Sequence, residues 1–270
     1  MKAQSAVLIL LRSMLLDADQ YEKLEVLLMS ESNLPGPRGN LELAGVFADQ
    51  FQTNDVAEEM WELLLKWTEI DSSQVDTNEA RVFLPFCAIQ ALGAYFPSAN
   101  ETKRRRCLDK IVAAMSDSRW RIREASAMAL QRIGESNFPA IRILFEQMFD
   151  HANLLERRAF VAALAHPPIL KDTDAALFAL ELSEHILDDI AADPSLGKSE
   201  EYRVLSKGLE YAISLFVEKL PLEGFALFNK YAVRGDKRIQ KIVKSNIGKS
   251  RIAKKYPDEI RRTEQLYGLQ

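Results

Sequence analysis

The chain has few glycines, prolines, cysteines and histidines, and each shortage excludes a class of structure. With 11 glycines, 10 prolines and no alternating runs of Val, Ile and Thr in 270 residues, the sequence predicts an all-helical protein. The two cysteines, Cys87 and Cys107, lack a CxxC spacing, which excludes a disulfide framework and favours a reducing cytoplasm. None of the histidines, His151, His166 and His185, has another histidine or cysteine three or four residues away, so we expect no metal site.

The sequence also lacks the short motifs of common enzyme classes. It contains no Walker-type phosphate loop, no GxGxxG, no HExxH and no GxSxG. No apolar run approaches the about 20 residues that a membrane span needs. The run Ala6–Leu11 is interrupted by Arg12, and no cleavage site follows it. We therefore expect a cytoplasmic protein with no cofactor, metal or membrane partner, and the leading hypothesis is not an enzyme.

Charge is distributed unevenly along the chain. The sequence is 47% apolar and 27% charged, with a net charge of −4, which suits a protein with a substantial core. Residues 1–100 carry 6 basic and 15 acidic side chains, whereas residues 231–270 carry 11 basic and 4 acidic ones. The overall charge argues against general affinity for nucleic acid, but the basic end is able to bind phosphate locally.

One pattern recurs along the chain and is clearest in residues 117–134, which read DSRWRIREASAMALQRIG. A shift of 34 residues aligns Arg123, Ala125, Ala129 and Leu130 with Arg157, Ala159, Ala163 and Leu164. The same apolar spacing occurs 38 residues earlier and again 83 and 117 residues later. Five helices of one design, 34 to 49 residues apart, predict a stacked array of helical pairs.

Breaker residues divide the chain into helices. The loop Pro35–Gly39 is the densest cluster of Pro and Gly, and it predicts a boundary between an N-terminal helical cap, residues 1–39, and one continuous repeat array, residues 40–270. Within the cap, residues 5–30 are expected to form two short helices. Further helices are expected at 41–52, 55–69, 79–95, 99–115, 119–134, 138–150, 153–165, 172–190, 199–219, 222–233, 236–249 and 258–267.

The Asp, the aliphatic–Arg pair, the spaced alanines and the final Leu-x-x-Ile-Gly of residues 117–134 resemble the second helix of a HEAT repeat. The likeness covers roughly residues 78–250 and implies a right-handed α-solenoid. In that family the corresponding Asp and Arg align neighbouring repeats, which gives this structural role to Asp117, Arg123 and Arg157. The family binds macromolecules on a curved surface. The leading hypothesis is therefore a non-catalytic scaffold that presents a concave helical surface to a partner, above all a protein.

Trp120 and Glu124 lie four residues apart and project from one side of their helix. They resemble the Trp and Asp of the bacterial alkylpurine DNA glycosylases, a HEAT-like branch. That resemblance implies that Trp120 holds a cationic base while Glu124 stabilises charge on the sugar, with Arg157 or Arg158 and Tyr202 in the two remaining roles. Glu124 replaces an Asp and Tyr202 replaces a Trp. Other interpretations of Trp120 are a plug between repeats and a contact for a partner.

Basic side chains near the C-terminus predict a phosphate-binding face. Lys237, Lys241 and Lys244 share one side of a helix whose other side is apolar, and Lys249 and Arg251 follow. Such a face neutralises the backbone of double-stranded DNA without reading bases. Alternatives are a solvated cap on the last repeat and an acidic protein partner. The binding surface expected in total comprises Trp120, Arg121, Glu124, Arg158, Lys207, Lys237, Lys241, Lys244, Lys249 and Arg251.

The hypotheses differ in the environment that they require for Trp120. DNA binding or glycosylase activity needs an exposed Trp120 with basic residues converging beside it. A third hypothesis, a protein-only adaptor that uses the acidic N-terminal half, expects Trp120 to be buried and the basic residues to be scattered.

Overall fold

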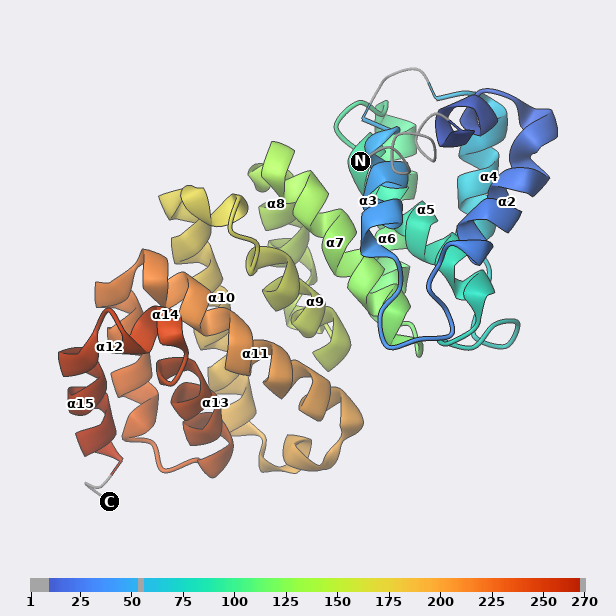
Figure 1. The fold of residues 1–270 in the computed structure, drawn as a ribbon. Coiled ribbons are helices and arrows are strands. Elements are labelled where there is room, and N and C mark those ends of the chain that lie inside the picture. The colour runs from blue at the N-terminus through green and yellow to red at the C-terminus, as the bar shows by residue number, and fades with distance from the viewer. Residues whose placement is uncertain (1–9, 53–55, 268–270) are drawn as a thin grey trace. The chain divides into compact units, whose positions relative to one another are not determined.

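The protein is described from a computed structural model, in which residues 10–52 and 56–267 are placed. All regular secondary structure in these residues is helical, and they contain no strand (Figure 1). The all-α prediction is confirmed. Part of the first predicted helix and most of the run Ala6–Leu11 lie outside the described residues.

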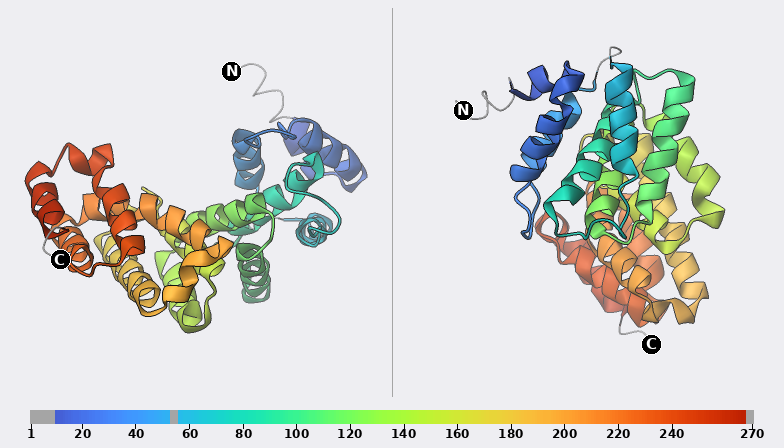
Figure 2. Two further views of the ribbon diagram at one scale, coloured as in Figure 1. Left: turned by 90° about the horizontal axis from the view of Figure 1, so that it is seen from below. Right: turned by 90° about the vertical axis from the view of Figure 1, so that its right-hand side faces the viewer.

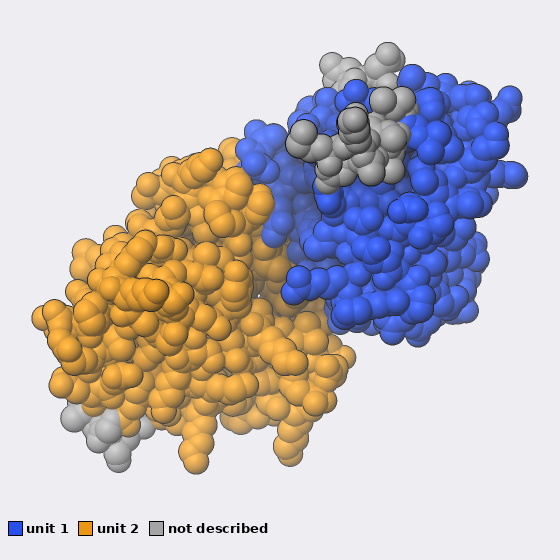
Figure 3. Space-filling model, in the orientation of Figure 1, with its two compact units in different colours: residues 1–137 blue, residues 138–270 orange. Residues whose placement is uncertain are grey.

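The chain forms two compact units, residues 1–137 (unit 1) and residues 138–270 (unit 2) (Figure 3). The helices of unit 1 are a short segment at residues 10–15, η1 (Ala18–Gln20), α2 (Tyr21–Ser30), α3 (Leu41–Asp49), α4 (Glu58–Thr68), η2 (Ala80–Val82), α5 (Phe83–Tyr95), α6 (Glu101–Met115) and α7 (Trp120–Ser136). Those of unit 2 are α8 (Phe138–Met148), η3 (Phe149–His151), α9 (Leu154–Leu164), η4 (Ile169–Lys171), α10 (Thr173–Ala192), η5 (Pro194–Lys198), α11 (Glu200–Lys219), α12 (Pro221–Ala232), α13 (Lys237–Ile247), α14 (Ser250–Ala253) and α15 (Pro257–Leu266).

These bounds lie close to the predicted ones, with two informative differences. The helix expected from residue 79 starts at Phe83, after the 3-10 turn of η2. The helix expected to reach residue 249 ends at Ile247, and the chain then forms the short α14. The division between units falls after residue 137, and α2, from the predicted cap, packs on α5 inside unit 1. The division into a cap and an array stays a prediction.

Helix α5 forms the centre of unit 1. All its residues from Phe83 to Tyr95 are buried, and α2, α3, α4, α6 and α7 pack around it. Helix α7 comes closest, because Gly93 of α5 faces Ala129 of α7. A Cβ atom built on Gly93 would lie 2.6 Å from both Cα and O of Ala129. The small side chain of Ala129, one of the alanines of the recurring pattern, therefore allows the close approach of α5 and α7.

Helix α11 has the corresponding place in unit 2. It packs against α9, α10, α12, α13 and α14, and its buried face contains Leu209, Ile213 and Phe216. Buried Asn246 of α13 joins the two helices, since its Nδ2 donates to Leu209 O and its Oδ1 accepts from Ser214 N. Helices α12 to α15 gather beside one another, as the orange to red segments of Figure 2 show.

We predict that the Gly93→Ala substitution destabilises unit 1, although alanine is the better helix former. The added methyl group overlaps the backbone of α7, and overpacking of this kind costs about 1–3 kcal/mol. Gly45→Ala on α3 is the matched control, because a Cβ there meets only Arg132 Nη2, at 3.8 Å. It should stabilise the protein by about 0.5–1 kcal/mol. Urea unfolding followed by circular dichroism measures both changes, and an equal gain from the two substitutions would show that α5 and α7 are not in this contact.

Candidate binding site

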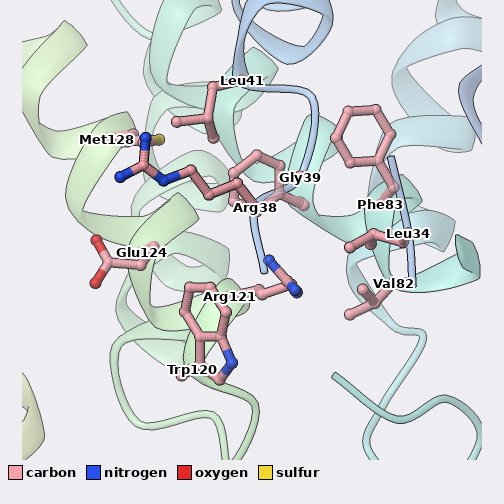
Figure 4. Close-up of a pocket in the computed structure, with 11 residues that line it drawn as sticks. Leu34, Arg38, Gly39, Leu41, Val82, Phe83, Trp120, Arg121, Glu124 and Met128 are labelled. Carbon is pink, nitrogen blue, oxygen red and sulfur yellow. The ribbon is translucent and has the colours of Figure 1, made fainter. Parts of the chain in front are cut away.

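Unit 1 contains a cavity of about 220 Å³, bounded by the loop after α2, the start of α5 and the first turns of α7 (Figure 4). In Figure 4, Trp120, Glu124 and Met128 belong to α7 on one side, and Leu34, Val82 and Phe83 lie opposite. The full lining is Leu34, Arg38, Gly39, Leu41, Val82, Phe83, Phe86, Trp120, Arg121, Glu124 and Met128. Most of these side chains are apolar, so the cavity is an apolar pocket with a few charged groups; we call it the Trp120 pocket.

Trp120 begins α7 and is 42% exposed. A buried plug between repeats is therefore not its role in unit 1, because a plug would be covered on all sides. This exposure fits the hypotheses in which Trp120 contacts a partner. The protein-only adaptor hypothesis expects Trp120 to be buried, so the exposure does not fit that hypothesis. A large aromatic ring at the mouth of an apolar pocket is the kind of residue that dominates binding energy at protein interfaces.

Arg121 was expected on the binding surface, and the structure corrects this expectation. Its side chain is only 4% exposed and points into unit 1. Nε donates to Thr77 O at 2.7 Å, and Nη2 donates to Gly36 O and to Asn78 Oδ1. The guanidinium also lies 4.3 Å from the centre of the Trp120 ring, and burial lowers its pKa. Arg121 thus holds the loop wall against α7 rather than presenting its charge to a partner.

Charge at the pocket comes from three side chains. Glu124 lies one helical turn after Trp120 and is half-buried, Arg38 is exposed on the loop, and Arg121 lies beneath Trp120. Figure 4 shows Arg38 extending from the loop toward the α7 side. Two guanidinium groups and one carboxylate give the pocket an excess of positive charge. Arg38 and the loop around it were missed as site residues, because the Pro- and Gly-rich segment was interpreted only as a boundary.

The other predicted glycosylase residues lie in unit 2. Tyr202, assigned the role of a second base-stacking aromatic, is only 6% exposed, and desolvation raises the pKa of its hydroxyl. It offers no ring for stacking, so this assignment is wrong. Arg158 is half-buried, with its Cγ 3.5 Å from the position of a Cβ on Gly208. Within unit 1, the structure brings together Trp120, Arg121 and Glu124 of the predicted set.

The predicted lysine face in unit 2 is partly neutralised. Lys241 Nζ lies 2.8 Å from Glu210 Oε1, and this hydrogen bond and charge raise the pKa of Lys241. For Glu210, the bonds from Lys241 and Ser206 outweigh desolvation, so its pKa is lowered. Lys237 and Lys244 are exposed, and Lys244 Nζ lies 4.6 Å from the ring centre of Tyr267.

The predicted ladder of Asp117, Arg123 and Arg157 has different partners in the structure. The Asp117 carboxylate binds Arg119, whose Nη2 lies 2.7 Å from Oδ2. Arg123 Nη1 donates to Asp117 O and Ser118 O. Arg157 Nη1 lies 2.6 Å from Oδ2 of Asp189 on α10.

The pair of Asp117 and Arg119 has a counterpart in unit 2, where Arg238 binds the Asp236 carboxylate. Arg238 also donates from Nη1 to Asp193 O. The recurring unit is thus Asp-x-Arg. A shift of 119 residues, from Asp117 to Asp236, would have revealed it in the sequence, whereas the shift of 117 that aligns the apolar positions does not.

The two cysteines are free, buried thiols on α5 and α6. Burial raises the pKa of Cys87 well above its usual value and that of Cys107 to about 12, so neither thiol is an activated nucleophile.

Within residues 10–52 and 56–267, no group of three His, Cys, Asp or Glu side chains is arranged to hold a metal ion. The helices of this described part are also too short or too polar to cross a membrane. The cytoplasmic location stays a prediction.

Comparisons of the chain with family models, with curated proteins and with solved structures gave no match. The likeness to HEAT repeats and to the alkylpurine glycosylases therefore rests on the pattern of residues 117–134 and stays a hypothesis.

We predict that Arg121→Ala loosens the wall of the Trp120 pocket. Loss of three hydrogen bonds from a buried cation should cost roughly 2–4 kcal/mol in urea unfolding. It should also speed tryptic cleavage after Arg38, because the loop loses its anchor at Gly36. Arg81→Ala, at an exposed arginine of η2, is the control and should change stability by less than about 0.5 kcal/mol. Wild-type cleavage kinetics in Arg121→Ala would contradict the anchoring role.

Proposed function

We propose that the protein is a non-catalytic binding module, a right-handed α-solenoid of HEAT-like repeats that holds a protein partner at the Trp120 pocket. Packing inside each unit supports the solenoid. Helices of the recurring design contact one another in series, α5 with α7 in unit 1, and α9 with α11 and α11 with α13 in unit 2. The intervening helices α6 and α12 each contact two members of that series, and α10 contacts α9, α11 and α13. Stacked helical pairs require this alternation.

The exposed ring of Trp120 beside an apolar pocket is the observation that carries the binding proposal. Pockets for drug-sized ligands usually measure about 300–1,000 Å³. The Trp120 pocket, at about 220 Å³, is smaller and suits one large apolar side chain. Burial of such an anchor in a pocket beside an aromatic residue is a common source of affinity between proteins.

Charge at the mouth favours a partner segment with an acidic residue beside its apolar anchor. Arg38 is exposed, and no ion pair to it occurs among the described residues. A guanidinium group binds a carboxylate through two parallel hydrogen bonds, which adds geometric specificity. The partner proposed is therefore a protein segment that places a Leu-, Met- or Phe-like side chain in the pocket and a carboxylate near Arg38.

The alternative is a glycosylase acting on alkylated purines in DNA, and one observation favours it: Trp120 and Glu124 line the same pocket. Two observations oppose it. A cationic base at Trp120 would meet the guanidinium of Arg121, 4.3 Å from the ring centre, together with that of Arg38 at the mouth. The second aromatic, Tyr202, is buried. Repulsion between cations in a pocket of low polarity makes this chemistry the weaker proposal.

We predict that peptides selected from a displayed library on the full chain share one large apolar residue next to Asp or Glu. Trp120→Ala should weaken their binding about tenfold or more, because it removes the aromatic wall of the pocket. Leu222→Ala is the matched control, since Leu222 of α12 is an exposed apolar residue, 81% exposed, outside the pocket. Isothermal titration calorimetry with synthetic peptides measures both variants, and equal weakening by the two would remove the pocket from the proposal.

A second prediction separates the binding module from the glycosylase. The glycosylase alternative requires that the wild-type chain release methylated purine from alkylated duplex DNA and that Glu124→Gln abolish this release while DNA binding persists. The binding proposal expects no release above the protein-free rate from either protein. Chromatography of the freed bases measures this release. Release by the wild type but not by the Glu124→Gln variant would establish the glycosylase activity.

A further inference from the structure

Unit 2 exposes an aromatic ring flanked by cations. Tyr211 of α11 is 52% exposed. The guanidinium carbon of Arg251 lies 4.9 Å from the centre of its ring, and Lys249 Nζ lies 6.0 Å from the same point. Both cations come from the turn after α13 and the short α14, which packs on α11 (Figure 1). Lys207 is exposed one helical turn before Tyr211, on the same side of α11.

In this cluster, Lys207, Tyr211, Lys249 and Arg251, hydrogen bonds hold Arg251 in place beside the ring. Arg251 Nη1 donates to Ser214 Oγ at 2.8 Å, and that hydroxyl donates to Tyr211 O at 2.9 Å. Beneath them, the side chain of Asn246 joins α13 to the backbone of α11 through Leu209 O and Ser214 N. Arg251 therefore keeps its place beside the ring without a ligand, and its binding to a partner costs little ordering of this side chain.

The positive charge of the cluster is not cancelled by the carboxylates of α11 that flank it in sequence. Glu210 pairs with Lys241 at 2.8 Å, and Glu218 pairs with Lys255 at 2.5 Å. Within the described residues, Lys207, Lys249 and Arg251 have no ion pair. Lys207 is exposed, and Lys249 and Arg251 are half-buried. The charge of the three side chains is thus available to an anionic partner.

We propose that this cluster binds single-stranded nucleic acid, with an unpaired base stacked on Tyr211 and the flanking phosphates neutralised by Lys207, Lys249 and Arg251. Aromatic rings beside basic side chains form the usual platform for single strands, because every base offers a flat face and every linkage a charge. The bases of a duplex already stack on one another and offer no such face. An acidic peptide matches the cations but has no group that requires the Tyr211 ring. The surface lies wholly in unit 2 and does not depend on the Trp120 pocket.

The test measures fluorescence anisotropy of a labelled 12-nucleotide oligothymidylate with the full chain, from low to physiological salt. The expected result is binding that weakens linearly on a log–log salt plot, with a slope of about −0.7 per phosphate neutralised. Tyr211→Leu keeps an apolar contact but removes stacking, and it should weaken binding about tenfold. Arg251→Gln and Lys207→Gln should each reduce the slope by about 0.7. Lys171→Gln, at an exposed lysine of η4, is the control and should bind as the wild type does.

Four outcomes would overturn the proposal. The first is no binding at low salt, and the second is wild-type affinity in Tyr211→Leu. The third is equal affinity for a duplex of the same length, which would assign the cluster to phosphates alone. The fourth is equally effective competition by polyglutamate of matched charge, which would assign it to an acidic protein. Tyr211 is exposed, so the Leu variant should keep its fold, and a circular dichroism spectrum checks this.

Discussion

The buried guanidinium of Arg121 is the interaction on which the candidate site of unit 1 depends. A buried cation without partners is strongly destabilising, so the fold around Arg121 must supply oxygen atoms to it. Gly36 O from the loop after α2 and Thr77 O with Asn78 Oδ1 from the segment before α5 supply them. One side chain of α7 thereby connects two segments far apart in sequence. The Trp120 pocket is the space that remains between those segments and α7, and its shape follows from this bridge.

Close packing of helices provides the rigid support for both proposed sites. In unit 1 the absent side chain of Gly93 brings α5 against α7 at Ala129, on the helix that carries Trp120 and Glu124. In unit 2 a polar contact has the equivalent effect, since Asn246 bonds the backbone of α11 below Tyr211. Binding residues on rigid helices need little reorganisation when a partner arrives, so more of the contact energy appears as affinity.

The sequence predicted the helices well because their signals are local. The Pro- and Gly-rich cluster Pro35–Gly39 indicates a loop in the same segment of chain, and the spacing of Ala125 and Ala129 indicates a helix there. The site was predicted only in part, because it depends on contacts across 40 to 90 residues. Arg121 adjoins exposed Trp120 on α7, and nothing local shows that its long side chain turns inward to carbonyl groups of distant loops. Tyr211 was overlooked for the same reason, since its cationic neighbours come from beyond α13.

Trp120 and Tyr211 resemble each other, as each is an exposed aromatic ring with a guanidinium at less than 5 Å, yet they suit different partners. The difference lies in the free N–H groups of the arginine. Arg121 directs its donors into the protein and is itself covered, which leaves beside Trp120 an apolar cavity that accepts a side chain. Arg251 donates only from Nη1 to the described part of the chain, so its other donors and its charge remain turned to solvent, where a phosphate can bind. Burial of the cation, more than the aromatic ring, thus determines which kind of partner each surface can hold.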